Sequence, residues 1–162
     1  MVAASGNKNP IYVVLENIRS AFNVGAFLRT ADAAGVEKVY MTGFTPVPQN
    51  CPKIAKTSLG AELEVNFAFR REPVSLLRSL SGKGMQIVAV EKTSEAKNIF
   101  QTSFNFPLVL VFGHEIDGIS REVLEIADLE VLIPMEGTKE SLNVSVCGGI
   151  AIFETLRKFK GS

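Results

Sequence analysis

Two loops in the second half of the chain carry the residues best suited to chemistry. Each follows a short apolar run and is crowded with glycine, carboxylate, hydroxyl and amide groups. The first loop contains Gly113, Glu115 and Gly118, and the second leads to Ser141 and Asn143. Glycines let a ligand approach the backbone, and a carboxylate binds a hydroxyl, an amine or an arginine. Such loops at the ends of buried strands predict a small-molecule pocket.

Simpler interpretations exist for both loops. The glycines and Glu115 also fit a tight strand-to-helix turn with solvated acids, and Ser141 or Asn143 can cap the amides of the last helix. His114 is the only histidine, and a general base at near-neutral pH is chemically possible. The sequence around His114 contains no Asp, Cys or Ser pattern typical of nucleophilic catalysis. We therefore favour a position in the loop without a catalytic role over a role as general base.

A third segment places Asn23 and Arg29 six residues apart. Apolar residues recur at helical spacing between them and beyond, which predicts a helix over 24–34, with Asn23 as N-cap and Gly35 as the stop. The charged guanidinium of Arg29, among apolar neighbours on a helix, needs an acidic side chain or a bound phosphate as its partner. The alternative for Arg29 is an arginine whose charged head reaches solvent.

Strands and helices alternate along the chain and position these residues. Apolar and β-branched runs predict strands at 11–15, 37–41, 64–68, 86–90, 108–112 and 129–133. Helices are expected at 24–34, 53–59, 73–80, from Ser120, and at 143–158. The last of these carries Val146, Ile150, Phe153 and Leu156 or Phe159 on one stripe. The alternation predicts an α/β fold with a mainly parallel sheet flanked by helices.

Two segments between these elements are expected to lack regular structure. Residues 42–52, rich in Gly, Thr and Pro, form a long loop of the kind that usually has a function. Residues 91–105 are polar and are expected to be irregular or a short helix.

Bulk composition restricts the class of protein. With 162 residues, 46% of them hydrophobic, residues 1–162 are expected to form a single domain. No apolar run approaches the roughly 18 residues of a membrane span, and the first ten residues lack the apolar core of a signal peptide, so we expect a cytoplasmic protein and no membrane partner.

Cys51 and Cys147 lack metal-ligand spacing, so neither a metal nor a disulfide is expected, and Cys147 is assigned to the core. Seventeen basic and 17 acidic residues balance, so a nucleic acid would need a local patch.

Taken in order, three motifs resemble the SpoU or TrmH family of RNA ribose 2'-O-methyltransferases, in the SPOUT class. The resemblance spans residues 11–159 and rests on Asn23, Gly25, Arg29, Thr30, Ala31 and Gly35, then on Gly113, Glu115, Gly118, Ile133, Pro134 and Met135, and finally on Ser141, Leu142, Asn143, Val144 and Ser145. One departure follows the third motif, where alanines are usual but Gly148 and Gly149 stand here. Each glycine costs a helix roughly 1 kcal/mol relative to alanine, so we expect close packing of this helix to compensate.

The resemblance implies a carboxyl-terminal trefoil knot, an exception to the rule against threaded chains, that binds S-adenosylmethionine. It implies a homodimer whose sites are completed across the interface, with Asn23 and the last helix as candidates. The implied cofactor-binding residues are Gly113, Ile133, Leu142, Val90 and Met135. The implied catalytic residue is Arg29, with Asn23, Glu115, Ser141 and Asn143 as further site residues, and Glu115, Ser141 and Asn143 are expected to hold Arg29 and the ribose in place.

The RNA must also be bound outside the reacting centre. Arg19, Lys56 and Lys53 are the candidates for phosphate contacts, whereas Arg70 and Arg71 are interpreted as solvated surface. The substrate-binding extension of some family members has no counterpart before the first strand, which makes tRNA a mild favourite over rRNA. One alternative is a non-catalytic RNA-binding or assembly protein with the same fold. Another is a nucleotide-binding hydrolase or dehydrogenase, for which the expected phosphate-binding motifs are missing.

Overall fold

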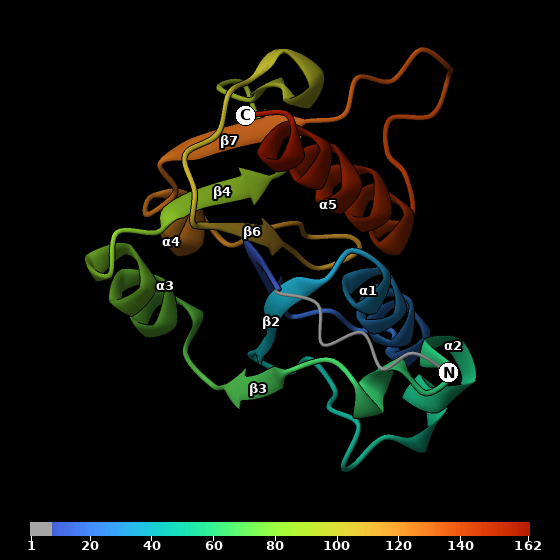
Figure 1. Ribbon diagram of the computed structural model, residues 1–162. Helices are drawn as coiled ribbons and strands as arrows, with labels where there is room; N and C mark the ends of the chain where they lie inside the picture. Colours follow the sequence, from blue (N-terminus) through green and yellow to red (C-terminus); the bar gives the residue numbers. More distant parts are fainter. Residues whose placement is uncertain (1–7) are drawn as a thin grey trace.

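The core of the molecule is a parallel sheet (Figure 1). The structure is a computed structural model that describes residues 8–162, and in that part of the chain seven strands pair in the order β3-β2-β1-β6-β4-β7-β5. Their bounds are β1 Asn9–Glu16, β2 Val36–Thr42, β3 Phe67–Arg70, β4 Gln86–Val90, β5 Lys97–Asn98, β6 Leu108–Phe112 and β7 Leu129–Leu132. All pairings are parallel, so the loops that follow the strands meet at one edge of the sheet, which is where α/β sheets bind ligands.

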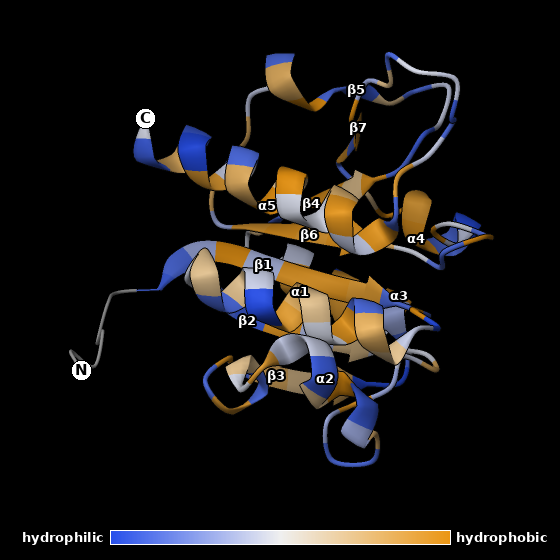
Figure 2. Ribbon diagram, turned by 90° about the vertical axis from the view of Figure 1, so that its right-hand side faces the viewer, coloured by the Kyte–Doolittle hydropathy of each residue, from blue (hydrophilic) through white to orange (hydrophobic). Residues whose placement is uncertain are grey.

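Helices cover both faces of the sheet. The α-helices are α1 Ala21–Ala33, α2 Ala55–Ser58, α3 Pro73–Gly82, α4 Arg121–Leu124 and α5 Val144–Lys160, and the 3-10 helices are η1 Pro52–Ile54, η2 Ala61–Leu63 and η3 Ile99–Gln101. One apolar core lies between the sheet and α1 and α5, and a second lies between the sheet and α3 and α4. Figure 2 looks onto the α1 and α5 layer, with the apolar strands behind it. The predicted α/β fold with a parallel sheet flanked by helices is confirmed.

Membrane insertion through a helix finds no support in residues 8–162, since no helix there is long and apolar enough to cross a bilayer. The expectation that the chain lacks a signal peptide rests mainly on residues 1–7, which lie outside the described residues.

Burial of the strands differs from the prediction at the edges of the sheet. β6 is buried at every position, as predicted. In β7, however, only Val131 is buried, because the next strand is the two-residue edge strand β5, which the sequence analysis did not predict. The third strand begins at Phe67 and not at residue 64, because the amides of Glu64 and Val65 both donate to the Ala61 carbonyl and close a turn.

The start of α1 also differs from the prediction. Ser20, and not Asn23, is the N-cap, and its hydroxyl accepts a hydrogen bond from the Asn23 amide. Asn23 therefore lies in the first turn, where its side chain is buried and free to contact another loop. Asn143 is the N-cap of α5 and accepts from the Ser145 amide, so the capping prediction at that helix is confirmed.

The predicted apolar stripe of the last helix faces the core only in part: Leu156 packs against it, but two other members are exposed. Val146 is 51% exposed and Phe153 is 47% exposed, whereas Gly148, Ala151 and Ile152 are buried. The reason lies at Gly148, where an added Cβ would be 2.1 Å from Cε1 of Phe27 in α1. The small-residue face of α5 thus lets the two helices pack closely, and this close packing explains Gly148. A Cβ added at Gly149 would have no neighbour within 4 Å, so the same explanation does not extend to that glycine.

Replacing Gly148 with alanine is expected to destabilise the protein by about 1–3 kcal/mol, because the new methyl group overpacks the fully buried Phe27 ring. Gly82→Ala is the matched control, since a Cβ at the end of α3, on the opposite face of the sheet, meets nothing within 4 Å. Thermal unfolding at one protein concentration measures both variants. Equal stability of Gly148→Ala and the wild type would contradict the close packing.

Candidate active site

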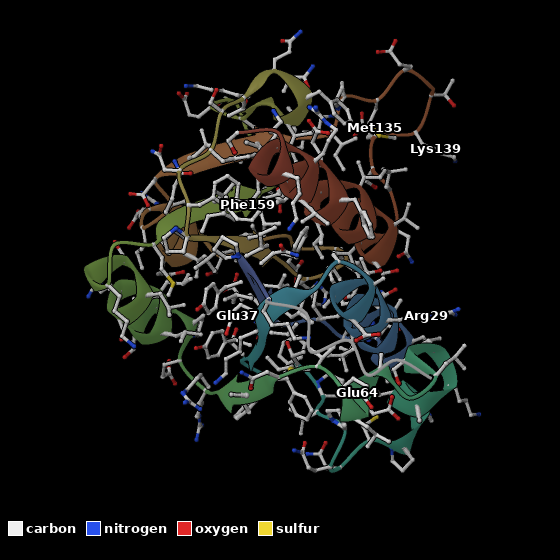
Figure 3. All side chains as sticks on the ribbon, viewed as in Figure 1. Arg29, Glu37, Glu64, Met135, Lys139 and Phe159 are labelled. Carbon is white, nitrogen blue, oxygen red and sulfur yellow. The ribbon has the colours of Figure 1, made fainter. Side chains whose placement is uncertain are left out.

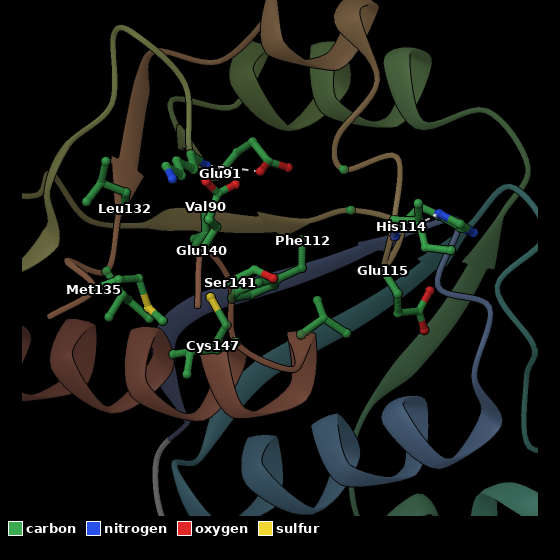
Figure 4. Close-up of a pocket in the computed structure, with 17 residues that line it drawn as sticks. Val90, Glu91, Phe112, His114, Glu115, Leu132, Met135, Glu140, Ser141 and Cys147 are labelled. Atoms are coloured by element: carbon green, nitrogen blue, oxygen red, sulfur yellow. Dashed lines mark hydrogen bonds between the residues drawn. The ribbon is translucent and has the colours of Figure 1, made fainter. Parts of the chain in front are cut away.

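A cavity of about 340 Å³ opens where β4, β6 and β7 end (Figure 4). Its volume lies within the range of small-molecule pockets. All five predicted cofactor-binding residues line it, and so do Glu115, Ser141 and His114. The complete lining is Val90, Glu91, Lys92, Phe112, Gly113, His114, Glu115, Ile116, Gly118, Leu132, Ile133, Met135, Glu140, Ser141, Leu142, Val144 and Cys147. The structure therefore brings the second and third sequence motifs together around one cavity.

The chemistry of the lining suits a ligand with an apolar body and a positive charge. Apolar side chains from the ends of β4 and β7 form the walls. Three acidic residues, Glu91, Glu115 and Glu140, and one basic residue, Lys92, are among the lining residues. Opposite charges attract more strongly in a partly enclosed cavity than in water, so the pocket favours a cationic ligand.

The backbone of the first loop is folded so tightly that its glycines are required. An added Cβ at Gly113 would be 2.3 Å from the Gly118 carbonyl carbon and the Ile119 nitrogen, and one at Gly118 would be 2.4 Å from Oε2 of Glu91. Gly118 also has φ +72°, in the left-handed region that favours glycine. Two backbone hydrogen bonds between His114 and Gly118, of 3.1 and 2.9 Å, close the turn. The loop therefore presents a fixed surface to the cavity.

Glu115 joins this loop to the start of α1. Its Oε2 accepts from the Arg19 amide at 2.9 Å, and its Oε1 accepts from the Ser20 amide at 2.9 Å and from Nδ2 of Asn23 at 3.0 Å. In Figure 4 the carboxylate points toward α1. Partial burial raises the pKa of Glu115, but the three hydrogen bonds together outweigh it and hold that pKa below the ordinary 4.5. The carboxylate is therefore ionised at neutral pH and ties the first motif to the second.

Replacing Glu115 with glutamine is expected to destabilise the protein by about 1–2 kcal/mol at neutral pH, because an amide cannot match the hydrogen bonds of the carboxylate. Since the folded-state pKa is lowered, the contribution of Glu115 is fully present above pH 4.5 and is lost as the pH falls through the folded-state value. Urea unfolding from pH 7 to pH 3 measures the difference between the two proteins. A difference that stays constant down to pH 3 would contradict this assignment.

Arg29 does not reach Glu115 within one chain, contrary to the expected contact. Its side chain is exposed and points outward from α1 (Figure 3), and it makes no hydrogen bond or ion pair with residues 8–162. A helix rises about 1.5 Å per residue, so Arg29 lies about 9 Å further along α1 than Asn23, which does contact Glu115. In the single chain, Arg29 is therefore an arginine whose charged group lies in solvent, which was the alternative interpretation.

The third motif divides between the pocket and the helix cap. Ser141 and Leu142 line the pocket, whereas Asn143 does not. Oδ1 of Asn143 accepts from the amide of Ser145 at 2.9 Å and from its hydroxyl at 2.7 Å. Neither Ser141 nor Asn143 contacts Arg29 in this chain.

Several pocket residues were not predicted from the sequence, and of these Glu91, Lys92, Glu140 and Cys147 carry functional groups. Cys147, expected in the core, lines the cavity beside Val144, one turn away on α5. Burial, and to a smaller extent the charge of Glu91, raises the pKa of the Cys147 thiol to about 11, so it is uncharged. The signal that could have found these residues was position, since Glu91 directly follows β4, Glu140 lies in the second loop and Cys147 is in the first turn of α5.

His114 has a structural role in its loop. Its Nδ1 accepts from the amides of Ile116 and Asp117 at 3.2 and 3.1 Å. That nitrogen is therefore occupied by the turn, in agreement with the low rank given to a general-base role. The three predicted RNA-binding side chains, those of Arg19, Lys53 and Lys56, are exposed.

The protein is an α/β domain with a parallel sheet. Its glycine loop and the cavity at the carboxyl edge of the sheet are features of domains that bind a cofactor. Within that class the chain belongs to the SpoU rRNA Methylase family, whose model matches residues 10–153. The family assignment made from the three motifs is thereby confirmed.

Two curated relatives bear names that refer to different RNAs. The chain is 34% identical over 148 residues to the tRNA (guanosine(18)-2'-O)-methyltransferase of Aquifex aeolicus, covering 91% of this chain and 69% of the relative. It is 35% identical over 149 residues to the 23S rRNA (guanosine-2'-O-)-methyltransferase RlmB of Ralstonia nicotianae, covering 92% and 59%. The chain thus spans about two thirds or less of the length of these relatives.

Two solved structures are similar to the whole described fold. One is the AdoMet-bound rRNA methyltransferase from Sinorhizobium meliloti, with a TM-score of 0.85 and 28% identity over 93% of this chain and 57% of that one. The other is a structure described as giving insight into the 2-OH methylation of C/U34 on tRNA, with a TM-score of 0.84 and 27% identity over 95% of this chain and 100% of that one.

Proposed function

We propose that the protein is an S-adenosylmethionine-dependent RNA methyltransferase that methylates a ribose 2'-hydroxyl. The observation that carries the proposal is the single pocket formed by the second and third motifs of a family whose named relatives are RNA 2'-O-methyltransferases. We place this activity in the cytoplasm.

The pocket residues fit S-adenosylmethionine. The backbone around Gly113, with Ile133, Leu142, Val90 and Met135, would hold its adenosine portion, and the negative charge of the lining residues Glu91 and Glu140 would favour its amino and sulfonium charges. A trefoil knot of the carboxyl-terminal part is part of the proposal. Its support is the chain path, in which β6 enters the sheet between β1 and β4 and is followed by β7 on the far side of β4.

The chain's own residues have two tasks in methyl transfer. When bound, S-adenosylmethionine supplies a methyl group already activated by its sulfonium. The protein must align the ribose 2'-oxygen with that methyl group and assist the loss of the hydroxyl proton. Arg29 would bind the neighbouring phosphate and stabilise the developing alkoxide charge. It would not act as a base, because a guanidinium keeps its proton at ordinary pH, so the proton would leave to phosphate or water.

The proposed enzyme is a homodimer, and Arg29 enters the pocket of the partner. Two observations support this arrangement. Arg29 is exposed and lies about 9 Å along α1 from Asn23, the residue that contacts Glu115 in the pocket loop of the same chain. The α1 and α5 layer also exposes large apolar side chains, Phe22, Val146, Phe153 and, beside it, Leu142, and exposed apolar surface of this kind marks protein interfaces. Asn23 is bonded to Glu115 of its own chain, so we assign it to positioning within one protomer and no longer to the interface.

We favour tRNA over rRNA as the substrate. The support is the similarity to a structure described as concerning 2-OH methylation on tRNA, at a TM-score of 0.84. Ser141 and Asn143 are proposed to position the ribose from the end of the second loop.

The experiment that tests the function is methyl transfer with the purified protein. Tritiated S-adenosylmethionine is supplied together with unmodified tRNA transcripts or with unmodified ribosomal RNA. Transfer of label to RNA, with tRNA the better substrate, supports the proposal. Binding of S-adenosylmethionine by calorimetry without transfer to any RNA would favour the alternative, a non-catalytic RNA-binding protein with the same fold.

A further inference from the structure

A second and larger cavity, of about 770 Å³, lies between the loop after β2 and the edge strand β3. Its walls include Phe44, Thr45 and Cys51 from the loop and Phe67 and Phe69 from the strand. We call it the edge groove. Phe44 is 61% exposed and Phe69 is 44% exposed. Two exposed phenylalanine rings at one groove are unusual for a purely solvated surface, because burying each would remove a large apolar area from water.

Basic residues lie close in the sequence to the residues that line the edge groove. Arg70 and Arg71 follow Phe69 directly, and Nη1 of Arg70 donates to the Phe69 carbonyl at 2.8 Å, which holds the guanidinium beside the strand. Lys53 lies two residues after Cys51 and is exposed. The nearby acid is Glu72, 3.9 Å from Arg71 in a fully exposed pair, and such pairs contribute little. Aromatic rings with adjacent cations are the features that bind unpaired nucleic acid, through stacked bases and phosphate contacts.

The edge groove is connected to the proposed cofactor pocket by rigid contacts. The Phe44 ring meets the His114 ring edge-on, with centroids 5.9 Å apart, and His114 lines that pocket. The Phe44 amide donates to Oδ1 of Asn17 at 3.2 Å, and Gly43 donates to the Arg71 carbonyl at 3.1 Å. A Cβ at Gly43 would be 1.8 Å from Oδ1 of Asn17, so the loop cannot be held this closely with any other residue. The backbone at Phe44 is thus held in place, and its ring lines the edge groove while contacting His114 of the proposed cofactor pocket.

We infer that the edge groove binds an unpaired nucleobase of the RNA substrate, stacked on Phe44 and Phe69, while Arg70 and Arg71 contact the adjoining phosphates. This inference rests on the proposed function, since it concerns a nucleotide near the one whose ribose is methylated. It replaces the interpretation of Arg70 and Arg71 as solvated surface. A base splayed into this groove would select single-stranded segments of RNA, because a paired base is not available for stacking.

The test measures RNA binding separately from methyl transfer. A fluorescein-labelled single-stranded oligouridylate, alone or annealed to its complement, is titrated with the wild type and with Phe44→Ala, Phe44→Leu, Phe44→Tyr and Phe69→Ala. Phe100→Ala is the control, because Phe100 is exposed to a similar degree in η3 at another part of the surface. Circular dichroism and thermal unfolding show that each variant is folded.

We expect Phe44→Ala and Phe44→Leu to weaken binding of the single strand roughly tenfold, while Phe44→Tyr and Phe100→Ala bind as the wild type does. An oligouridylate that carries 5-iodouracil should cross-link to Phe44 or Phe69 under ultraviolet light. Unchanged affinity in Phe44→Ala and Phe69→Ala, equal binding of the duplex, no binding by the wild type, or cross-links elsewhere would overturn the inference. Failure to methylate any RNA would overturn the proposed function instead, and binding at the edge groove would still stand.

Discussion

Lysine at position 29 is expected to lower the rate of methyl transfer by roughly 10²- to 10³-fold, the loss typical of removing one electrostatic stabiliser of a transition state. Lysine keeps the positive charge but not the planar fork that contacts phosphate and ribose oxygens together. Arg29 does not line the pocket of its own chain, and in the partner's pocket it would contact the phosphate and ribose oxygens and not the cofactor, so affinity for S-adenosylmethionine should stay unchanged. Single-turnover transfer of a tritiated methyl group and calorimetry measure the two quantities.

The matched control is Arg78→Lys, since Arg78 is also an exposed helix arginine but lies in α3, on the other face of the sheet. This variant should transfer methyl groups at the wild-type rate. Retained activity of Arg29→Lys would remove Arg29 from the reacting centre.

Alanine at Gly113 is expected to weaken binding of S-adenosylmethionine by roughly tenfold to a hundredfold. Its methyl group would lie 2.3 Å from backbone atoms of Gly118 and Ile119. Backbone atoms cannot move away by a rotamer change, as the atoms of a flexible side chain can. Overpacking of this kind costs about 1–3 kcal/mol, and each 1.4 kcal/mol changes affinity about tenfold. The distortion falls on the loop that lines the cavity, so the cost appears in cofactor affinity, which calorimetry measures.

Gly137→Ala is the control for this loop. Gly137 lies in the second loop but does not line the cavity, and a Cβ there meets nothing within 4 Å. Its affinity should equal that of the wild type. Equal affinity of Gly113→Ala would mean that the cofactor does not depend on this loop.

The two variants also test the shared site. If Arg29 acts in the pocket of the partner, a mixed dimer of Arg29→Lys and Gly113→Ala chains contains one pocket with both intact parts. Mixing the two weakly active proteins should then restore up to about half of the activity per dimer. No restoration on subunit exchange would place Arg29 and the pocket loop in the same protomer.

Much of the fold was predictable because local signals and burial agree. The run at β6 is apolar at every position and is buried on both faces of the sheet. Where tertiary contacts decide, prediction failed. The stripe through Val146 and Phe153 is apolar and periodic, yet the contact between Gly148 and Phe27 turns a different face of α5 inward. Periodicity reports an apolar face, but not whether the core or another molecule covers it.

The site shows the same division. The loop residues Gly113, Leu142 and Ile133 were predicted to share a pocket and do so, because the ends of parallel strands meet at one edge. The separation of Arg29 from Glu115 was not predictable, because spacing along α1 does not say which residue faces the pocket loop. Asn23 takes that place, and Ser20 takes the cap position expected for Asn23.

The central claim, transfer of a methyl group to a ribose 2'-oxygen of RNA, is tested most directly by nucleoside mass spectrometry. RNA from cells that carry the gene is compared with RNA from cells that lack it, with tRNA and ribosomal RNA separated first. The account predicts that one 2'-O-methylated nucleoside disappears from the tRNA of the cells that lack the gene and returns on complementation with the wild type, but not with Arg29→Lys. Unchanged ribose methylation in both RNA classes, or loss of a methyl group from a base, would contradict it.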